Sequence, residues 1–489
     1  MLPLEKTQNN IQMKKLIIIS LTLACGLSLS AGTKPLLDVS NPWQAIKEVE
    51  KNIKAPEFPK REFIITNFGA KEGVEDYKTN AINSAINACA SKGGGVVIVP
   101  KGTFYTGPIT LKSNVNLHLE DGAVVKFSTN PEDYLPVVLT RWEGWDCMNF
   151  HPLIYAYGEA NIAITGNGTL DGQGSNEKWW PWKGKKEHGY KEGDKSQEWN
   201  GTEANGGRNR LSKMEETNVP MAKRIMTPED CLRPTFIEPY NCKNVLLEGF
   251  TLTNSPFWCL HPFMSENVTI RSVTINSQGP NNDGCDPESC KDVLIEKCSF
   301  NTGDDCIAIK SGKNNDGRRW AKPSENIIVR KCQMKDGHGG VVLGSEISGN
   351  VKNVWVEDCV MDSPNLDRVI RIKSNPLRGG KLENFFIRNI KVGQCKEAVF
   401  RVEMKYEKVT EGPNMPLVRN FVMENVTCGK SEYGVWIDGF ADSPKKQVTG
   451  VTFKNCKFDN VTTPQKIVGA ENIVFDNLVI NGKKVEVEK

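Results

Sequence analysis

From residue 161 to the C-terminal region, the chain repeats one short pattern of polar and apolar positions. Each copy begins with Asn or Asp, after which apolar residues alternate with other residue types. Period-two alternation is typical of β-strands, because successive side chains point to opposite faces. The copies begin at Asn161, Asn244, Asn267, Asp292, Asn326, Asn353, Asn384, Asn420 and Asn472. A coil length of roughly 22 to 35 residues, with insertions, predicts an all-β fold, a parallel β-solenoid with the polar residues at its bends.

Ahead of the repeat, residues 80–91 have the periodicity of one amphipathic helix. Ala81, Ile82, Ala85, Ile86 and Cys89 recur at helical spacing, and the glycines at 93–95 end the pattern. We expect this helix to cap the open hydrophobic end of the solenoid. Short strands are predicted at 63–65, 96–99, 110–111, 115–119 and 123–127. A lead-in at 32–60, with a short helix near 43–49, precedes a β-helix domain at 61–489.

The N-terminus has the pattern of an export signal. Met13-Lys14-Lys15 is positively charged, and the apolar run at 16–29 is too short to span a bilayer. We expect a signal peptide over residues 1–31, with Met13 as an alternative start. An alternative is a lipid anchor on Cys25, although Thr22 fits the lipoprotein pattern poorly. Either way the sequence predicts an exported protein, periplasmic or secreted.

Charge and cysteine usage narrow the functional classes. The net charge is +3 over 489 residues and there is no basic tract, so nothing indicates a nucleic-acid partner. Of the 15 cysteines, Cys298, Cys332, Cys359 and Cys456 occupy apolar positions of the repeat. We therefore expect most cysteines to be buried free thiols rather than disulfides. Metal ligation is disfavoured, since no CxxC or HxxxH pairing occurs.

Polar, turn-like clusters interrupt the repeat between residues 281 and 373. Asp283 and Asp304 are 21 residues apart, which is close to one minimal coil. They should lie on neighbouring rungs about 5 Å apart, with Asp305 beside them. Mutual repulsion then raises at least one pKa, so that one site can supply both an acid and a base. A calcium site or an asparagine-ladder variant is the alternative for one Asp-Asp pair alone.

A histidine and two cations fall at the same place in later coils. His338 lies between glycines that let backbone and substrate approach closely. Arg371 and Lys373 are at i and i+2 of a strand, so both point to one face. These cations either bind a substrate carboxylate or form salt bridges with the aspartates. The combination of carboxylates, histidine and cations indicates a catalytic surface for an anionic sugar.

Four motifs carry a resemblance to a known family. Asn281-Asn282-Asp283-Gly284, Gly303-Asp304-Asp305-Cys306, Gly337-His338-Gly339 and Arg371-Ile372-Lys373 resemble the motifs of the polygalacturonases, glycoside hydrolase family 28. The family usually has threonine where this chain has Asn282. Further similarity is found at Gly168–Gly174 with Trp179-Trp180, at Ser255–Trp258 and at Gly344-Ser345-Glu346. It extends from about Phe63 to the C-terminus.

The resemblance implies a right-handed parallel β-helix that hydrolyses α-1,4-galacturonosyl bonds with inversion. By this resemblance Asp304 is the general acid, and Asp283 and Asp305 hold and deprotonate the attacking water. His338 adjusts the hydrogen bonding of the acid, while Arg371 and Lys373 bind the galacturonate carboxylate. Inverting hydrolysis needs acid and base carboxylates roughly 6.5–9.5 Å apart. The resemblance implies neither a metal nor an organic cofactor, and the partner is a polysaccharide or oligosaccharide that contains galacturonic acid.

A long polar insert at 172–234 interrupts the repeat. It contains Trp179-Trp180-Pro181-Trp182, a basic run at 183–186, and arginines at 208 and 210. It is either a solvated surface loop, or its aromatics and cations border a sugar-binding groove. Together with Thr140–Gly144 it resembles sequences of exo-acting bacterial and plant-like members of the family, so we predict exo action.

Three other functions stay open at this point. A pectate-type lyase on the same fold would cleave by elimination, with Arg371 or Lys373 as its base. A solenoid that only binds glycans would tolerate substitution of its aspartates. A hydrolase of rhamnogalacturonan or xylogalacturonan would share the motifs. We expect a monomer in each case.

Overall fold

The computed structural model describes residues 37–198 and 206–487. The signal peptide predicted over 1–31, including Cys25, lies outside these residues. The chain divides into two compact units, Met1–Asp38 and Val39–Lys489. No helix in its described part is both long and apolar enough to cross a membrane.

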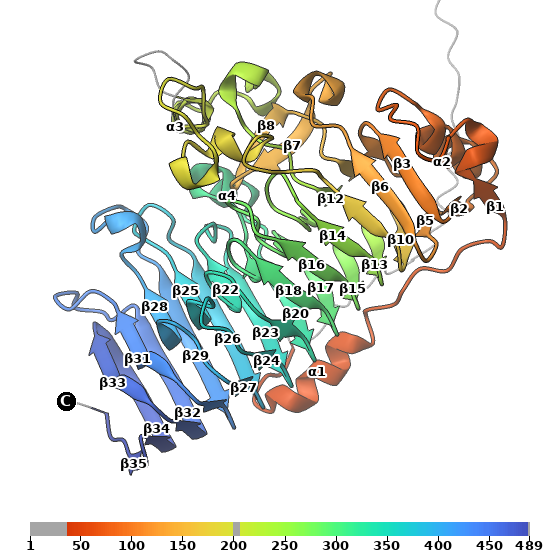
Figure 1. The fold of residues 1–489 in the computed structure, drawn as a ribbon. Coiled ribbons are helices and arrows are strands. Elements are labelled where there is room, and N and C mark those ends of the chain that lie inside the picture. The colour runs from red at the N-terminus through yellow and green to blue at the C-terminus, as the bar shows by residue number, and fades with distance from the viewer. Residues whose placement is uncertain (1–36, 199–205, 488–489) are drawn as a thin grey trace, which may run out of the picture. The chain divides into compact units, whose positions relative to one another are not determined.

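The second unit is a parallel solenoid in which each coil repeats strands of the coil before it (Figure 1). Its largest sheet has 24 strands, which form two ladders. The first contains β1 (Glu62–Ile64), β2 (Gly95–Val99), β5 (Val115–Leu119), β10 (Ala160–Gly166), β13 (Lys243–Glu248), β15 (Glu266–Arg271), β17 (Lys291–Glu296), β20 (Ser324–Arg330), β23 (Val351–Glu357), β26 (Lys381–Arg388), β29 (Leu417–Glu424), β32 (Val448–Phe458) and β34 (Ala470–Ile480), which ends on β35 (Lys483–Lys484). The second contains β3 (Gly102–Thr106), β6 (Ala123–Phe127), β11 (Thr169–Asp171), β14 (Thr251–Thr253), β16 (Thr274–Ser277), β18 (Ser299–Thr302), β21 (Gln333–Met334), β24 (Val360–Met361), β27 (Lys391–Val392) and β30 (Thr427–Cys428).

Two shorter parallel sheets form the face that carries the polar clusters. One contains β4 (Ile109–Thr110), β9 (Ile154–Tyr157) and β12 (Ile237–Tyr240). The other contains β19 (Ile307–Ile309), β22 (Val341–Gly344), β25 (Arg368–Lys373), β28 (Ala398–Glu403), β31 (Ser431–Asp438) and β33 (Val461–Val468). A hairpin of β7 (Val138–Trp142) and β8 (Trp145–Asn149) projects beside them. The predicted parallel β-helix is therefore confirmed.

The asparagines lie at the bends, as the sequence predicts, and adopt the left-handed conformation there. Asn326, Asn353 and Asn384 have φ of 60°, 59° and 64°. Each side-chain amide nitrogen donates to the bend residue of the preceding coil, over 2.8 Å from Asn326 to Asp292, 3.1 Å from Asn353 to Asn326 and 2.9 Å from Asn384 to Asn353. The polar row thus satisfies its own hydrogen bonds while it turns the chain.

The interior contains stacked apolar side chains, including the cysteines. All fourteen cysteines of the described residues are buried and free, which confirms the prediction of buried thiols. Helix α2 (Ala81–Ser91) packs on β1, β2, β4 and β5 at the N-terminal end, as expected of a cap. Helix α1 (Pro42–Glu50) lies on the outer surface, where Trp355 Nε1 donates to Pro42 O over 2.9 Å. The lead-in from Val39 onward thus belongs to the solenoid unit.

The insert at 172–234 folds over the polar face rather than forming a plain loop. It contains α3 (Gly207–Glu216) and short 3₁₀ turns at Trp180–Lys183, Lys186–His188, Met221–Lys223 and Pro228–Asp230. Trp179 is buried and packs edge-on against Tyr134 and Trp182. The suggestion that the aromatics of the insert border a groove is therefore wrong for Trp179. This ring anchors the insert instead, because burying a large ring stabilises the fold more than exposing it does.

Candidate active site

The four polar clusters stack on successive coils of the polar face. Cys285 pairs with Ile307, so Asp283 lies in register with Asp305. The backbone of His338 donates to Asp304 O over 3.1 Å. Arg371 pairs with Val342 of the neighbouring strand, one coil further on. The prediction that these side chains gather on one face is confirmed.

The three carboxylates lie as close together as neighbouring rungs predict. One oxygen each from Asp283, Asp304 and Asp305 lies within 4.8 Å of the others. This agrees with the spacing of about 5 Å expected for neighbouring rungs, and it is shorter than the roughly 6.5–9.5 Å typical of inverting enzymes. The reason is the register, since strands one rung apart bring side chains to about 5 Å. Asp305 is fully buried behind the surface that Asp283 and Asp304 form.

A cationic group faces each carboxylate. Lys373 Nζ lies 2.7 Å from Asp305 Oδ2, and Lys310 Nζ lies 3.5 Å from Asp283 Oδ2. His338 Nδ1 lies 3.0 Å from Asp304 Oδ1. The alternative that the cations are salt-bridge partners of the aspartates thus holds for Lys373.

Arg371 pairs elsewhere. Its Nη2 lies 3.0 Å from Glu403 Oε2, and its guanidinium lies 5.5 Å from the ring centre of Tyr406. The ammonium of Lys373 lies 5.4 Å from the same ring. Both cations thus lie within reach of a cation–π contact with Tyr406, and all three side chains line the cavity.

The carboxylates differ in proton affinity. Burial raises the pKa of Asp283, and the nearby charges of Asp286 and Asp304 raise it further against Lys310. Burial would also raise the pKa of Asp304, but the charge and hydrogen bond of His338, together with the charges of Lys373 and Lys310, outweigh it and lower that pKa. The charge of Asp304 raises the pKa of His338 to about 9. The pKa of one carboxyl, that of Asp283, is raised as predicted, but burial is a larger cause than the predicted mutual repulsion.

A cavity of about 430 Å³ opens over these groups. The catalytic-face residues that line it are Trp258, Asn281, Asp283, Asp304, Lys310, His338, Ser345, Glu346, Arg371, Lys373 and Tyr406. The insert contributes Lys183, Lys185, Glu187, His188, Glu198 and Arg208. Glu143 from the β7–β8 hairpin and Glu407 from the loop after β28 complete the lining. The prediction that cations of the insert border the groove is confirmed.

Comparison with known proteins identifies the family. The model of Glycosyl hydrolases family 28 matches residues 222–416, which contain all four motifs. The solved structure of a hyperthermoactive exopolygalacturonase from Thermotoga maritima is 40% identical, with a TM-score of 0.86. The match covers 91% of this chain and 97% of that one. The chain belongs to glycosyl hydrolases family 28.

Other relatives agree with this placement of the glycosyl hydrolase. A probable polygalacturonase of Vitis vinifera is 28% identical over 426 residues, which are 82% of this chain and 75% of that protein. An exo-poly-alpha-D-galacturonosidase of Dickeya chrysanthemi is 26% identical over 452 residues, which are 85% and 70% of the two chains. The resemblance read from the motifs is confirmed.

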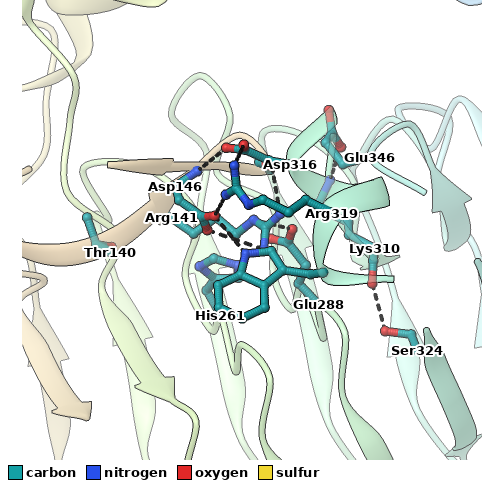
Figure 2. A network of polar contacts seen from close by, with 12 residues as sticks. Thr140, Arg141, Asp146, His261, Glu288, Lys310, Asp316, Arg319, Ser324 and Glu346 are labelled. Atoms are coloured by element: carbon teal, nitrogen blue, oxygen red, sulfur yellow. Dashed lines mark hydrogen bonds and ion pairs between the residues drawn. The ribbon is translucent and has the colours of Figure 1, made fainter. Parts of the chain in front are cut away.

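A buried polar network holds the hairpin of this glycosyl hydrolase beside the site (Figure 2). Arg141 Nε lies 2.9 Å from Glu288, which also lies 2.9 Å from His261 Nε2. Arg319 Nη2 donates to Asp146 Oδ2 over 2.7 Å. Because Arg141 is only two residues before Glu143, these ion pairs hold the hairpin from which Glu143 lines the cavity. This network could not be predicted from the sequence, since its members come from separate coils.

The three aspartates also form the donor set of a cation site. Their oxygens are hard ligands of the kind that Ca²⁺ and Mg²⁺ prefer. However, the ammonium groups of Lys310 and Lys373 already face two of these carboxylates. A divalent cation there would meet two positive charges at close range, so the donor set fits a metal poorly.

Proposed function

We propose that this family 28 hydrolase is an exopolygalacturonase, which removes single galacturonate units from the end of an α-1,4-galacturonan. The observation that carries the proposal is the covered cavity over Asp283 and Asp304. The insert, the hairpin and the loop after β28 meet over one side of it, since Arg208 lies 2.9 Å from Glu143 and 3.4 Å from Glu407. A groove closed in this way accepts a chain end rather than the middle of a chain.

The proposed chemistry assigns opposite tasks to the two carboxylates on the cavity wall. Asp283 has a raised pKa, which makes its carboxylate the stronger base, and it takes a proton from the attacking water with Asp305 behind it. Asp304 has a lowered pKa, which makes its protonated form the stronger acid toward the leaving oxygen. His338 carries the proton in the resting enzyme and returns it across the 3.0 Å contact with Asp304. Attack of water on the anomeric carbon then yields galacturonate and a shortened chain.

The cations suit an acidic sugar. Arg371 and Lys373 lie at the cavity wall above Tyr406. Lys183, Lys185 and Arg208 add positive charge from the insert. A substrate with one carboxylate on each sugar matches these groups better than a neutral glycan does.

Digestion of defined galacturonic acid oligomers tests the proposal, with Asp304→Asn as the matched control. We expect the wild type to release single saturated galacturonate units and the variant to release none above background. Unsaturated, ultraviolet-absorbing products would indicate the lyase instead. A ladder of mixed oligomers would overturn exo action, and no cleavage by the wild type would direct the search to branched pectins.

We also propose that the protein is exported, supported by the charged and apolar pattern of residues 13–29. N-terminal sequencing of the protein from its native host tests this. Cleavage after Ala31 or lipidation at Cys25 would support export. An intact N-terminus in the cytosolic fraction would overturn it.

A further inference from the structure

Lys310 has a position in the cavity that none of the sequence motifs indicates. It follows β19 directly, is 2% exposed and lines the cavity. Its Nζ lies 3.5 Å from Asp283 Oδ2, 3.4 Å from Asp286 Oδ1 and 3.1 Å from Glu346 Oε2. These carboxylates come from the preceding coil and the following one. Figure 2 shows Lys310 with its contact to Glu346.

The chemistry of this position suits a lysine. An ammonium group has three N–H donors, and three carboxylates surround Nζ. The ring of Trp258 covers another side at 4.4 Å, where the cation meets the aromatic face. Burial would lower the pKa of Lys310, but the charges of Glu346, Asp283 and Asp286 outweigh it and raise that pKa. Lys310 is therefore a fixed positive charge behind Asp283.

Asp286 extends the arrangement away from the cavity. It is fully buried, three residues after Asp283, and neither of its side-chain oxygens has a hydrogen-bond partner within the described residues. Burial raises the pKa of Asp286 to about 8, against the charge of Lys310. The single positive charge of Lys310 thus faces three carboxylates, and the charge balance of this buried group depends on that lysine.

We propose that Lys310 is a positioning residue of the hydrolysis, which fixes Asp283 at the cavity wall and keeps it ionised as the base. Lys310 pairs with Asp283 in the way that Lys373 pairs with Asp305, and the two aspartates lie on neighbouring coils. This proposal rests on the proposed hydrolytic function, and it assigns Lys310 no contact with substrate. The alternative is a lysine that only stabilises the fold by neutralising buried acids.

The test compares Lys310→Met with Lys313→Met in the full-length protein. Lys313 is an equally buried lysine, but its Nζ pairs with Glu143 at 3.4 Å and lies 3.7 Å from the ring centre of Trp145. Both variants lose a buried charge, so both should lose stability. We expect K310M to lose about 100-fold in kcat on a galacturonate oligomer, the lower range for a displaced general base. K313M should keep kcat within about threefold of the wild type.

The pH profile separates positioning from folding. Removing the positive charge raises the pKa of Asp283 further, so the acid limb of kcat/KM should move to higher pH in K310M. The charged groups that face Asp283 and Lys310 in this comparison are Asp286, Asp304, Asp305, Glu346, His338 and Lys373. A lysine with only a structural role would lower the amount of folded enzyme and leave this limb in place.

Lys310→Ala with added ethylamine covers the case in which K310M folds poorly. The amine can occupy the space of the removed side chain, and we expect it to restore at least tenfold in kcat. An active wild type whose K310M variant keeps kcat and the acid limb would overturn the proposal. So would an active wild type whose K310A variant folds but is not rescued. Failure of the wild type to hydrolyse any oligomer would overturn the proposed function itself.

Discussion

His338 Nδ1 lies 3.0 Å from Asp304 Oδ1, with the two residues in register on neighbouring coils. Each shifts the proton affinity of the other. The charge of Asp304 raises the pKa of His338 to about 9, and His338 lowers the pKa of Asp304 despite burial. The pair therefore holds one proton beside the cavity at neutral pH.

His338→Gln should move the alkaline limb of the pH–activity profile. A raised pKa means that His338 is charged below about pH 9 and loses its proton above it. In the wild type the proton supply to Asp304 therefore fails only above about pH 9. Without His338, Asp304 returns toward the ordinary pKa of a carboxyl, about 4, and is rarely protonated at neutral pH. We expect H338Q to lose about 100-fold in kcat at pH 7 and less at pH 4.5, in initial rates on an oligomer. An unchanged alkaline limb would contradict the role of His338 as the proton donor to Asp304.

The stereochemistry of the product follows from which group attacks. If water attacks opposite the α-linked leaving group, the first product is β-galacturonate. The 4.8 Å limit between carboxylate oxygens is near the separation at which a carboxylate can attack directly and retain the anomer. We nevertheless expect inversion, because ion pairs with Lys310 and Lys373 keep Asp283 and Asp305 in place. Proton NMR of the first turnovers would show the β-anomer before mutarotation. The α-anomer first would assign Asp283 as a nucleophile.

Much of the solenoid could be predicted because its pattern is local. The asparagine at each bend and the alternation after it are visible in ten residues of sequence. The 21-residue spacing also placed Asp283 and Asp304 on adjacent coils. It could not tell that Asp283 aligns with Asp305 rather than Asp304, because a one-residue change of register moves every side chain.

Side-chain contacts between coils could not be predicted from the sequence. Lys310 looks like one more residue after a strand, and only stacking shows that it faces acids of two neighbouring coils. Trp179 was a candidate for bordering a sugar-binding groove. Whether its ring is buried or exposed depends on the path of the insert, which packs it against Tyr134. Arg208 was visible as a cation, yet its partners are 65 and 199 residues away along the chain.

Arg208→Met should loosen the cover of the cavity. Arg208 joins the insert to Glu143 and Glu407, and its partner Glu143 keeps a lowered pKa of about 2 because Arg208 and Lys313 outweigh burial. Glu143 therefore stays ionised and paired with Arg208 well into the acidic range. We expect KM for oligomers to rise about tenfold, because the variant loses the charge-assisted hydrogen bond that holds the cover in place. Galacturonate dimers and trimers should also appear among the products by anion-exchange chromatography.

Arg210→Met is the matched control for that prediction. Arg210 lies on the same helix, but its Nη1 pairs with Asp230 inside the insert at 2.6 Å and it does not line the cavity. It should keep the product pattern of the wild type. The same change of products in both variants would show that the insert matters only through its overall stability.

Asn353→Ala should destabilise the solenoid through the bend itself. Asn353 has a φ of 59° and is 9% exposed. Its amide nitrogen donates to Asn326 over 3.1 Å, and its oxygen accepts from Asn384 over 2.9 Å. Alanine loses both hydrogen bonds, at about 1 kcal/mol each, and strains the left-handed backbone by about 1–2 kcal/mol. We expect urea unfolding to show a free energy of unfolding lower by about 3–4 kcal/mol. Asn353→Gly loses the same hydrogen bonds without the strain, so its loss should be about 1–2 kcal/mol smaller. Equal losses in the two variants would show that the left-handed bend stores no strain.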